Sequence, residues 1–202
     1  EATFVQTATV ADGDGAGLTF IQVLTLVWIA GFVLLLVRSV VSLVRLMMLL
    51  RSGRLCETCG TLVTVVSGDT APFSWFNRIV ISLKDYLSGA REIVIHEQAH
   101  VSHHHSVDIA LCNTIIMFCW FSPAAWLLRA ELRDVHEYEA DDAVLRQGVD
   151  ASGYQLLLIR KAVGERLFAM ANNLNQTNLK KRITMMKMKK SNPWNRVKAA
   201  IV

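Results

Sequence analysis

A long uncharged run most constrains how this chain can fold. Residues 18–37, LTFIQVLTLVWIAGFVLLLV, contain no Asp, Glu, Lys or Arg. At about 1.5 Å per residue, a helix of this length spans the ~30 Å hydrocarbon layer of a bilayer. The sequence therefore predicts a transmembrane helix. It continues as an amphipathic extension that ends near Gly53, so we assign 18–54 to this unit.

The basic residues predict how this helix is oriented. Arg38, Arg45, Arg51 and Arg54 follow the run, and neither Lys nor Arg precedes it. Because basic residues gather on the cytoplasmic side, we expect residues 1–17 outside the cell and the chain after Arg38 to begin in the cytoplasm. The chain starts with Glu rather than Met, so we expect further sequence upstream. A hydrophobic fraction of 52% also favours a mainly α membrane protein.

A short motif, His96-Glu97-Gln98-Ala99-His100, predicts a metal centre. Side chains four residues apart share one helix face, so His96 and His100 can offer two imidazole nitrogens to one ion. Glu97 lies one step around the axis, close enough to reach a water at the metal. This is the arrangement of zinc peptidases, and it requires a third ligand from elsewhere. The alternative without a metal is a helix with two surface histidines.

The second apolar stretch, residues 107–121, predicts a hairpin rather than a second crossing. Pro123 interrupts it, and Asp108 and Asn113 are costly in lipid. A helix over 107–120 is about 20 Å long and one over 123–137 about 21 Å, so an antiparallel pair brings residue 137 level with His100. We expect this hairpin to dip into the membrane or to lie against it.

An acidic motif on the second hairpin helix supplies the expected third ligand. Glu137 and Asp141 are four residues apart on a helix that runs from 123 to about 147 and is closed by Gly148. We assign Glu137 to the metal and Asp141 to fixing the tautomer of a ligating histidine. His103, seven residues after His96, is a rival ligand, and a solvated acidic face is the bland alternative. Together with His96 and His100, these residues predict one bound zinc ion per chain.

The remaining segments complete a zinc-peptidase domain over 55–171. Residues 61–66 and 75–82 predict a small β-sheet upstream of the metal helix, whose edge either pairs with extended substrate or only packs the core. Ser88 is the expected N-cap of a metal helix over 89–104. Cys56 and Cys59 are interpreted as an ordinary thiol pair in a reducing compartment.

The tail over 172–202 is strongly basic. It holds eight Lys or Arg residues and no acid. A juxtamembrane segment on anionic lipid explains this charge better than a nucleic-acid site, because no known binding module accompanies it. We therefore expect membrane lipid as a partner and no direct nucleic acid.

Several motifs together resemble the integral-membrane metallopeptidases of the β-lactam sensor and antirepressor type, BlaR/MecR, over nearly all of residues 18–202. Two further pieces are similar to the branch of that family found in Bacteroidetes. The motifs are His96-Glu97-x-x-His100, Trp120-Phe121-Ser122-Pro123-Ala124-Ala125-Trp126 and Glu137-x-x-x-Asp141-Asp142-Ala143-Val144-Leu145, and the further pieces are Pro72-Phe73-Ser74-Trp75-Phe76 and Leu179-Lys180-Lys181-Arg182-Ile183-x-Met185-Met186.

The resemblance implies a gluzincin-like zinc site on the cytoplasmic side of a bacterial inner membrane, with Glu97 as the base. It also implies signal-dependent cleavage of a transcriptional repressor, of the chain itself, or of both. Relatives often carry an acid five residues after the second histidine, where this chain has His105, followed by Asp108. Both are therefore candidates, with His103, for supporting the site. No penicillin-binding domain is present, so we expect any sensor in further sequence or in a partner protein.

Mechanistically, we expect Glu97 to deprotonate the attacking water and to pass the proton to the leaving amine. His103, His105 and Tyr138 are alternative groups for stabilising the oxyanion. Two other functions remain open. One is a housekeeping membrane protease of the HtpX or CaaX-processing type, which would digest proteins broadly. The other is a non-catalytic membrane scaffold in which zinc only staples two helices.

Overall fold

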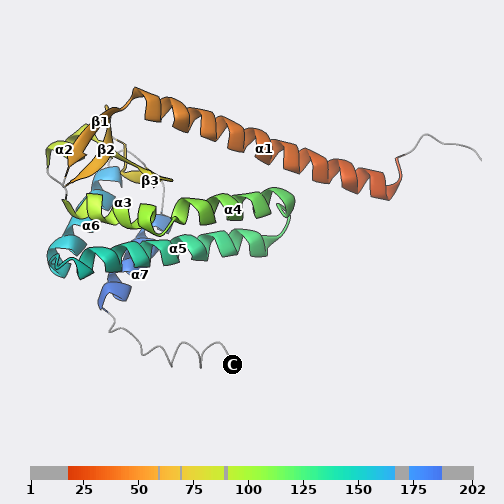
Figure 1. Cartoon of the computed structure of the whole chain (residues 1–202). Coiled ribbons are helices and arrows are strands. Elements are labelled where there is room, and N and C mark those ends of the chain that lie inside the picture. The colour runs from red at the N-terminus through yellow and green to blue at the C-terminus, as the bar shows by residue number, and fades with distance from the viewer. Residues whose placement is uncertain (1–17, 59, 69, 89–90, 167–172, 188–202) are drawn as a thin grey trace, which may run out of the picture.

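The computed structural model describes residues 18–58, 60–68, 70–88, 91–166 and 173–187. The expected extracytoplasmic segment, 1–17, lies outside these residues. A long helix, α1 (Phe20–Ser52), leads into a small sheet, and the rest of the described chain is helical. Figure 1 shows α1 extending away from the sheet on the same side as a pair of antiparallel helices, α4 and α5.

Helix α1 ends at Ser52, next to Gly53, as its sequence predicts, and it begins two residues after the expected position 18. Thr19 caps its N-terminus: the Thr19 side chain accepts from the Gln22 N–H, and the Gln22 side chain accepts from the Thr19 N–H. Gly53 follows the last helical residue. Within the described residues, α1 is the one helix long and apolar enough to cross a membrane, and its apolar window is not buried in the protein. Most of these apolar side chains are exposed.

The sheet has four strands in the order β1-β2-β4-β3. Strands β2 and β4 are parallel, and the two outer pairs are antiparallel, so β3 is an edge. The prediction of one strand over 75–82 was wrong, because a turn at Phe76, with φ of 49°, separates two strands there. The strands are β1 (Arg54–Thr58), which the sequence analysis missed, β2 (Thr61–Val66), β3 (Phe73–Trp75) and β4 (Arg78–Ser82).

A short helix, α2 (Leu83–Leu87), separates the sheet from the metal-motif helix, α3 (Arg91–Ser102). Ser82 caps α2 by accepting from the Asp85 N–H. The prediction that Ser88 is the N-cap of the metal helix was wrong. Ser88 follows the C-terminus of α2, where its hydroxyl donates to the Asp85 carbonyl. The expected start of the metal helix at 89 falls on residues outside the described ones, and α3 ends two residues before the expected position 104.

The predicted helical hairpin is confirmed. Helices α4 (His105–Phe118) and α5 (Pro123–Arg146) run side by side in opposite directions (Figure 1). The tip of the hairpin, where α4 connects to α5, packs against α1. The Trp28 indole N–H donates to the Phe118 carbonyl at 3.0 Å, and the Trp120 indole N–H donates to the Trp28 carbonyl at 3.3 Å. Gly148, with φ of 77°, follows the end of α5.

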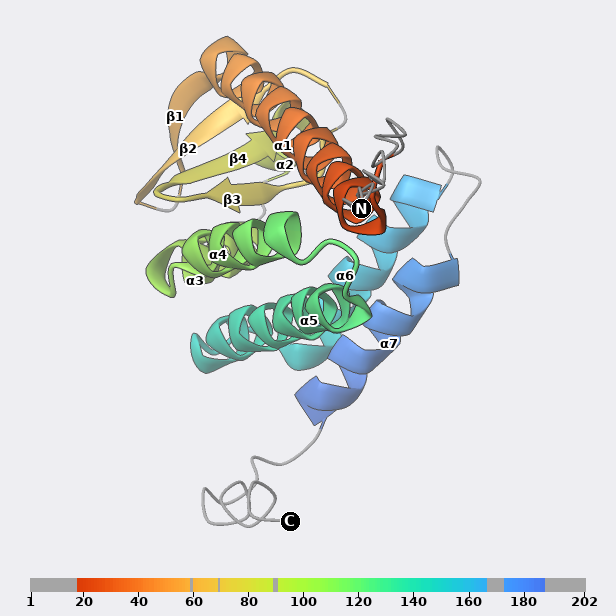
Figure 2. The ribbon, with the colours of Figure 1, turned by 90° about the vertical axis from the view of Figure 1, so that its right-hand side faces the viewer.

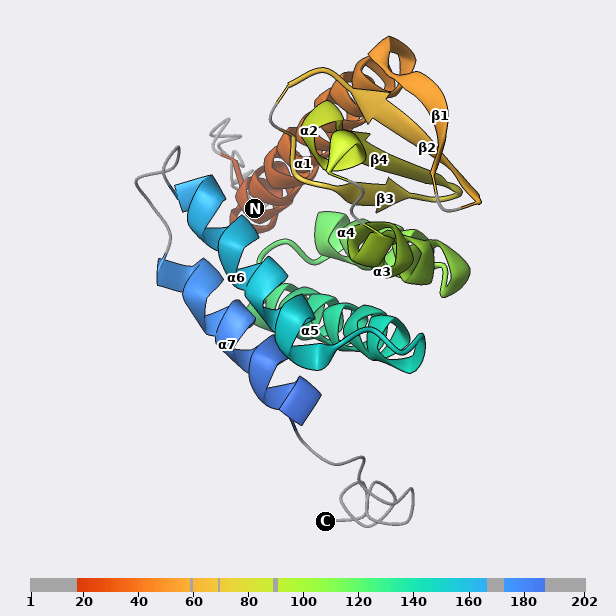
Figure 3. The ribbon, with the colours of Figure 1, turned by 90° about the vertical axis from the view of Figure 1, so that its left-hand side faces the viewer.

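Two final helices close the fold. Helix α6 (Ala151–Arg166) and helix α7 (Asn173–Lys187) lie side by side, and both cross the α5 layer (Figures 2 and 3). Helix α7 packs on α5 and α6, so the described part of the basic tail is part of the folded domain. Residues 188–202 lie outside the described residues, and an interaction of the tail with lipid stays a prediction.

Candidate metal centre

Helix α3 is held in place on two sides, which leaves one face for chemistry. Val94 packs into the sheet core, and Ile95 packs with Val144 of α5 and Tyr154 of α6. The packing on both sides fixes the rotation of α3 about its axis. His96 and His100 therefore both line the cleft between the sheet and the helices.

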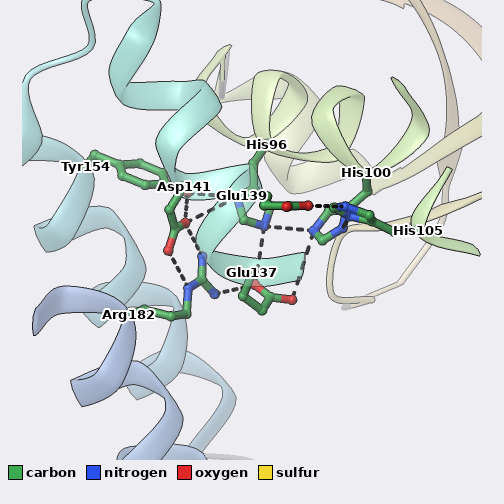
Figure 4. Close-up of polar contacts among 8 residues, drawn as sticks. All are labelled: His96, His100, His105, Glu137, Glu139, Asp141, Tyr154 and Arg182. Atoms are coloured by element: carbon green, nitrogen blue, oxygen red, sulfur yellow. Dashed lines mark hydrogen bonds and ion pairs between the residues drawn. The ribbon is translucent and has the colours of Figure 1, made fainter. Parts of the chain in front are cut away.

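Three potential metal donors meet at this face (Figure 4). His96 Nε2 lies 3.2 Å from His100 Nε2 and 3.4 Å from Glu137 Oε2, and His100 Nε2 lies 4.0 Å from Glu137 Oε1. Bonds of about 2.0–2.1 Å at a tetrahedral ion place its ligand atoms about 3.4 Å apart. The three side chains therefore fit one zinc-sized ion.

The far side of the His96 ring fixes its tautomer. The Tyr154 hydroxyl donates to Asp141 Oδ1 at 2.8 Å and lies 2.9 Å from His96 Nδ1. Since that hydroxyl proton is directed at Asp141, the hydroxyl oxygen accepts from Nδ1–H. Asp141 Oδ1 itself lies 3.4 Å from the same nitrogen. This arrangement leaves the His96 Nε2 lone pair facing the three-donor centre.

His100 is oriented by a histidine rather than by a carboxylate. Its Nδ1 lies 2.8 Å from Nδ1 of His105, whose Nε2 lies 3.0 Å from Glu139 Oε2. If His100 Nδ1–H donates to His105 Nδ1 and His105 Nε2–H donates to Glu139, each of these three side chains has a hydrogen-bond partner. His105 thus occupies the position where the resemblance led us to expect an acid, and Glu139 supplies the carboxylate on the far side of the His105 ring.

Arg182 of α7 ties the two acidic side chains of α5 together. Its Nη1 lies 2.8 Å from Glu137 Oε2, and its Nε and Nη2 donate to Asp141 at 2.9 and 2.6 Å. Burial would raise the pKa of Glu137, but the hydrogen bond that His96 donates through Nε2 when its ring is protonated, together with the charge of Arg182, outweighs burial and lowers that pKa to about 2. The carboxylate is therefore kept ionised, as a metal ligand must be.

The surroundings of Glu97 shift its pKa in the opposite direction to that of Glu137. It is buried, and burial raises the pKa of Glu97 to about 7, opposed by the charge of His96 and reinforced by that of Glu137. A side-chain hydrogen bond with Ser74 of β3 favours its ionised form. A carboxyl group with a pKa near neutrality can both accept and release a proton.

The centre opens into a cleft of about 660 Å³. One wall is formed by residues 71–74, which end in the edge strand β3, and another by α5. Besides Glu97 and Glu137, charged side chains of both signs from α5, α6 and α7 line the cleft: Glu131, Arg133, Asp134, Lys161, Lys181 and Arg182. The cleft is large enough for several residues of a peptide.

Other predicted supporting residues lie away from the three donors. His103 is exposed and stacks on His105, with ring centroids 5.5 Å apart. Asp108 pairs with His136 at 3.2 Å. Tyr138 is not among the residues lining the cleft. The proposed third ligand is thus Glu137, and the rival, His103, belongs to a different group of side chains.

Sequence reasoning missed three residues of this centre. Tyr154 and Arg182 reach it from α6 and α7, and Glu139 reaches it beside Glu137. For Arg182 a signal was available, because it lies in one of the motifs that carry the family resemblance. Tyr154 carried no such signal, since only the packing of α6 places it against α3.

A pair of histidines on one helix, a carboxylate from another and a buried acid beside a cleft is the arrangement expected of a metallopeptidase centre. The comparison with protein families agrees: the model described as BlaR1 peptidase M56 matches residues 8–186. The chain belongs to this family of membrane-associated metallopeptidases, as its motifs predicted. A comparison with curated proteins finds no match.

Proposed function

We propose that this protein is a zinc metalloendopeptidase of gluzincin type, with His96, His100 and Glu137 as ligands and Glu97 as the base. The observation that carries the proposal is the meeting of three donors from two helices at 3.2–4.0 Å. The tautomers set by Tyr154 and His105 support it, because both leave Nε2 free for the ion. Zinc is favoured because two imidazoles and one carboxylate leave a fourth position open for substrate.

In this mechanism Glu97 moves the proton. When bound, zinc acts as a Lewis acid that polarises the scissile carbonyl and acidifies a water. Glu97 accepts the proton of the attacking water and then donates it to the leaving amine. Its raised pKa supports both roles. Tyr154 and His105 hold the two imidazoles in place throughout, and Arg182 holds the Glu137 carboxylate.

The substrate is an extended segment of a protein. Strand β3 pairs only with β4 in the described sheet, so its other edge is available for backbone hydrogen bonds. Residues Phe73 and Ser74 of this strand line the cleft beside His96. A peptide added to β3 would therefore pass the three donors. Pairing through the main chain binds a peptide without requiring one sequence.

Two features, α1 and the hairpin tip, support a position in the membrane. Apolar side chains of the hairpin tip are exposed beside α1, among them Phe118, Phe121, Leu127 and Leu128. We propose that α1 spans the bacterial inner membrane with its N-terminus outside and that the tip enters the lipid next to it. The centre then lies at the cytoplasmic face, where it cleaves a transcriptional repressor, its own chain, or both, after a signal received by a sensor.

Quantitative mass spectrometry of cytoplasmic and membrane proteins tests this function. Cells that carry the wild type are compared with cells that carry Glu97→Gln, which keeps the three donors. We expect one or a few new cleavage products, in a repressor or in the chain itself, only with the wild type. Broad digestion of membrane proteins would instead support the housekeeping function. Identical peptide profiles, with folding lost on zinc removal, would support the scaffold.

A further inference from the structure

A second group of potential metal donors lies next to the first. His103, His105 and Glu139 each offer one ligand atom, and these atoms all lie within 4.8 Å of one another. His103 has no part in the proposed cleavage, and Glu139 supports it only through its contact with His105. We propose that these three side chains form a second site for a divalent transition-metal ion, and that an ion bound there weakens the first site through His100.

One side chain of this second group is buried and held in place, and the other two are exposed to solvent. His105 is buried and stacks on His136, with centroids 3.8 Å apart and planes 8° apart. His136 is itself held by Asp108, so the His105 ring has little freedom to turn. His103 and Glu139 are both exposed. An ion can therefore enter from solvent and meet a ligand whose direction is already set.

The donor set selects the class of ion. Two imidazoles and a carboxylate suit zinc, copper and nickel, whereas magnesium and calcium prefer oxygen ligands. The 3.0 Å between His105 Nε2 and Glu139 Oε2 is a hydrogen-bond distance, and it needs to widen by only about 0.4 Å to match the spacing at a tetrahedral ion. Zinc is a suitable probe of the second site, because it is also the ion proposed for the first site.

The two sites share a hydrogen-bond chain, and this sharing makes them antagonists. An ion on His100 Nε2 leaves the proton on His100 Nδ1, which donates to His105 Nδ1 at 2.8 Å (Figure 4). The His105 proton then lies on Nε2, facing Glu139. A second ion needs the lone pair of His105 Nε2, so the His105 proton must move to Nδ1. The Nδ1–H groups of His100 and His105 would then face each other and lose their hydrogen bond. This part of the inference rests on the proposed function.

Zinc titration of four forms of the full chain in detergent tests the proposal. The forms are the wild type, His96→Ala, His103→Ala and His104→Asn. His104 is the matched control, because it lies in the same histidine run but outside both donor groups, and Asn tolerates its left-handed backbone, with φ of 56°. We expect two ions in the wild type and in His104→Asn, and one in each of the other variants. Equal stoichiometry in the wild type and His103→Ala would overturn the second site.

The coupling has its own readout in the same titrations. Loss of a supporting hydrogen bond at a ligating histidine typically lowers metal affinity about 10–100-fold. By linkage, the second ion should bind the wild type about 10–100-fold more weakly than the single ion binds His96→Ala. Equal affinities would overturn the antagonism. If His96→Ala loses no ion while His103→Ala does, the proposed first site fails and the second site stands.

Discussion

The two ends of the α4–α5 hairpin differ in how their polar groups are satisfied. At the base, charged and titratable side chains pair with one another, as in His136 with Asp108 and Glu137 with Arg182. At the tip, indole N–H groups of Trp120 and Trp126 donate to backbone carbonyls, and apolar side chains are exposed. One pair of helices therefore joins an ionic centre to a surface suited to lipid.

This difference has energetic consequences. Removing one partner of a buried ion pair leaves an uncompensated charge, which is costly. Removing one neutral hydrogen bond typically costs only about 0.5–1.5 kcal/mol. Substitutions at the base should therefore change metal binding, activity and stability together. Substitutions at the tip should change the packing against α1 and leave the centre intact.

The largest effect is expected for Glu137→Gln at the base. The amide is a poor metal ligand and cannot balance Arg182, so zinc affinity should fall by more than about 100-fold, and cleavage should fall to background. Metal content after gel filtration and a cleavage assay measure this. Glu131→Gln, which changes an acid lining the same cleft, is the control. A Glu137→Gln protein that binds as many zinc ions as the wild type, with the same affinities, would contradict the predicted difference between the base and the tip.

Arg182→Gln should follow, with an effect on stability. Asp141 is buried, and it would lose both hydrogen bonds from Arg182. We expect about 3 kcal/mol of destabilisation, because a buried carboxylate is left without its partner. Chemical denaturation in detergent measures it, with Lys180→Gln on the same helix as the control. If both variants unfold at the same denaturant concentration, Arg182 is not a structural part of the base.

Tyr154→Phe should have a smaller and more specific effect. It removes the hydroxyl between His96 and Asp141 and keeps the ring that packs on Ile95. Zinc affinity should fall about 10–100-fold, with little change in folding. Competition with a chelator measures the affinity, and Tyr86→Phe is the matched control. Unchanged affinity would show that Asp141, at 3.4 Å from His96 Nδ1, fixes the tautomer alone.

Gly31→Leu should affect the tip and spare the base. A Cβ at Gly31 would overlap the Trp120 ring, so the tip must shift away from α1, at a typical cost of about 1–3 kcal/mol. Tryptophan fluorescence should report the shift, while zinc affinity stays within about twofold of the wild type. Ala30→Leu on the neighbouring helix position is the control. A large loss of zinc affinity would mean that the two ends are not independent.

Local patterns were sufficient for the parts of the fold that depend on spacing. The position of Glu137 followed from the lengths of two helices and the proline between them, and the structure places it beside His96. The end of α1 at Gly53 and the end of α5 near Gly148 also followed from single residues. In each case the constraint lies within a few turns of one helix or one hairpin.

Contacts between distant elements could not be obtained in the same way. Strand β1 has mostly exposed side chains, so its sequence lacks the alternation of apolar residues that predicts a strand. It is a strand because its backbone pairs with that of β2. Arg182 was counted as part of a basic tail, because nothing in its local sequence shows that α7 packs on α5. The partner of His100 was uncertain for the same reason: His105 needs Glu139, from a helix 34 residues away, to complete its hydrogen bonds.

Anomalous diffraction at the zinc edge, on crystals of the full chain grown with one equivalent of zinc, tests the central claim most directly. We expect one main peak, about 2.0–2.1 Å from His96 Nε2, from His100 Nε2 and from a carboxylate oxygen of Glu137. A peak that excludes Glu137, or one centred on other side chains, would contradict it.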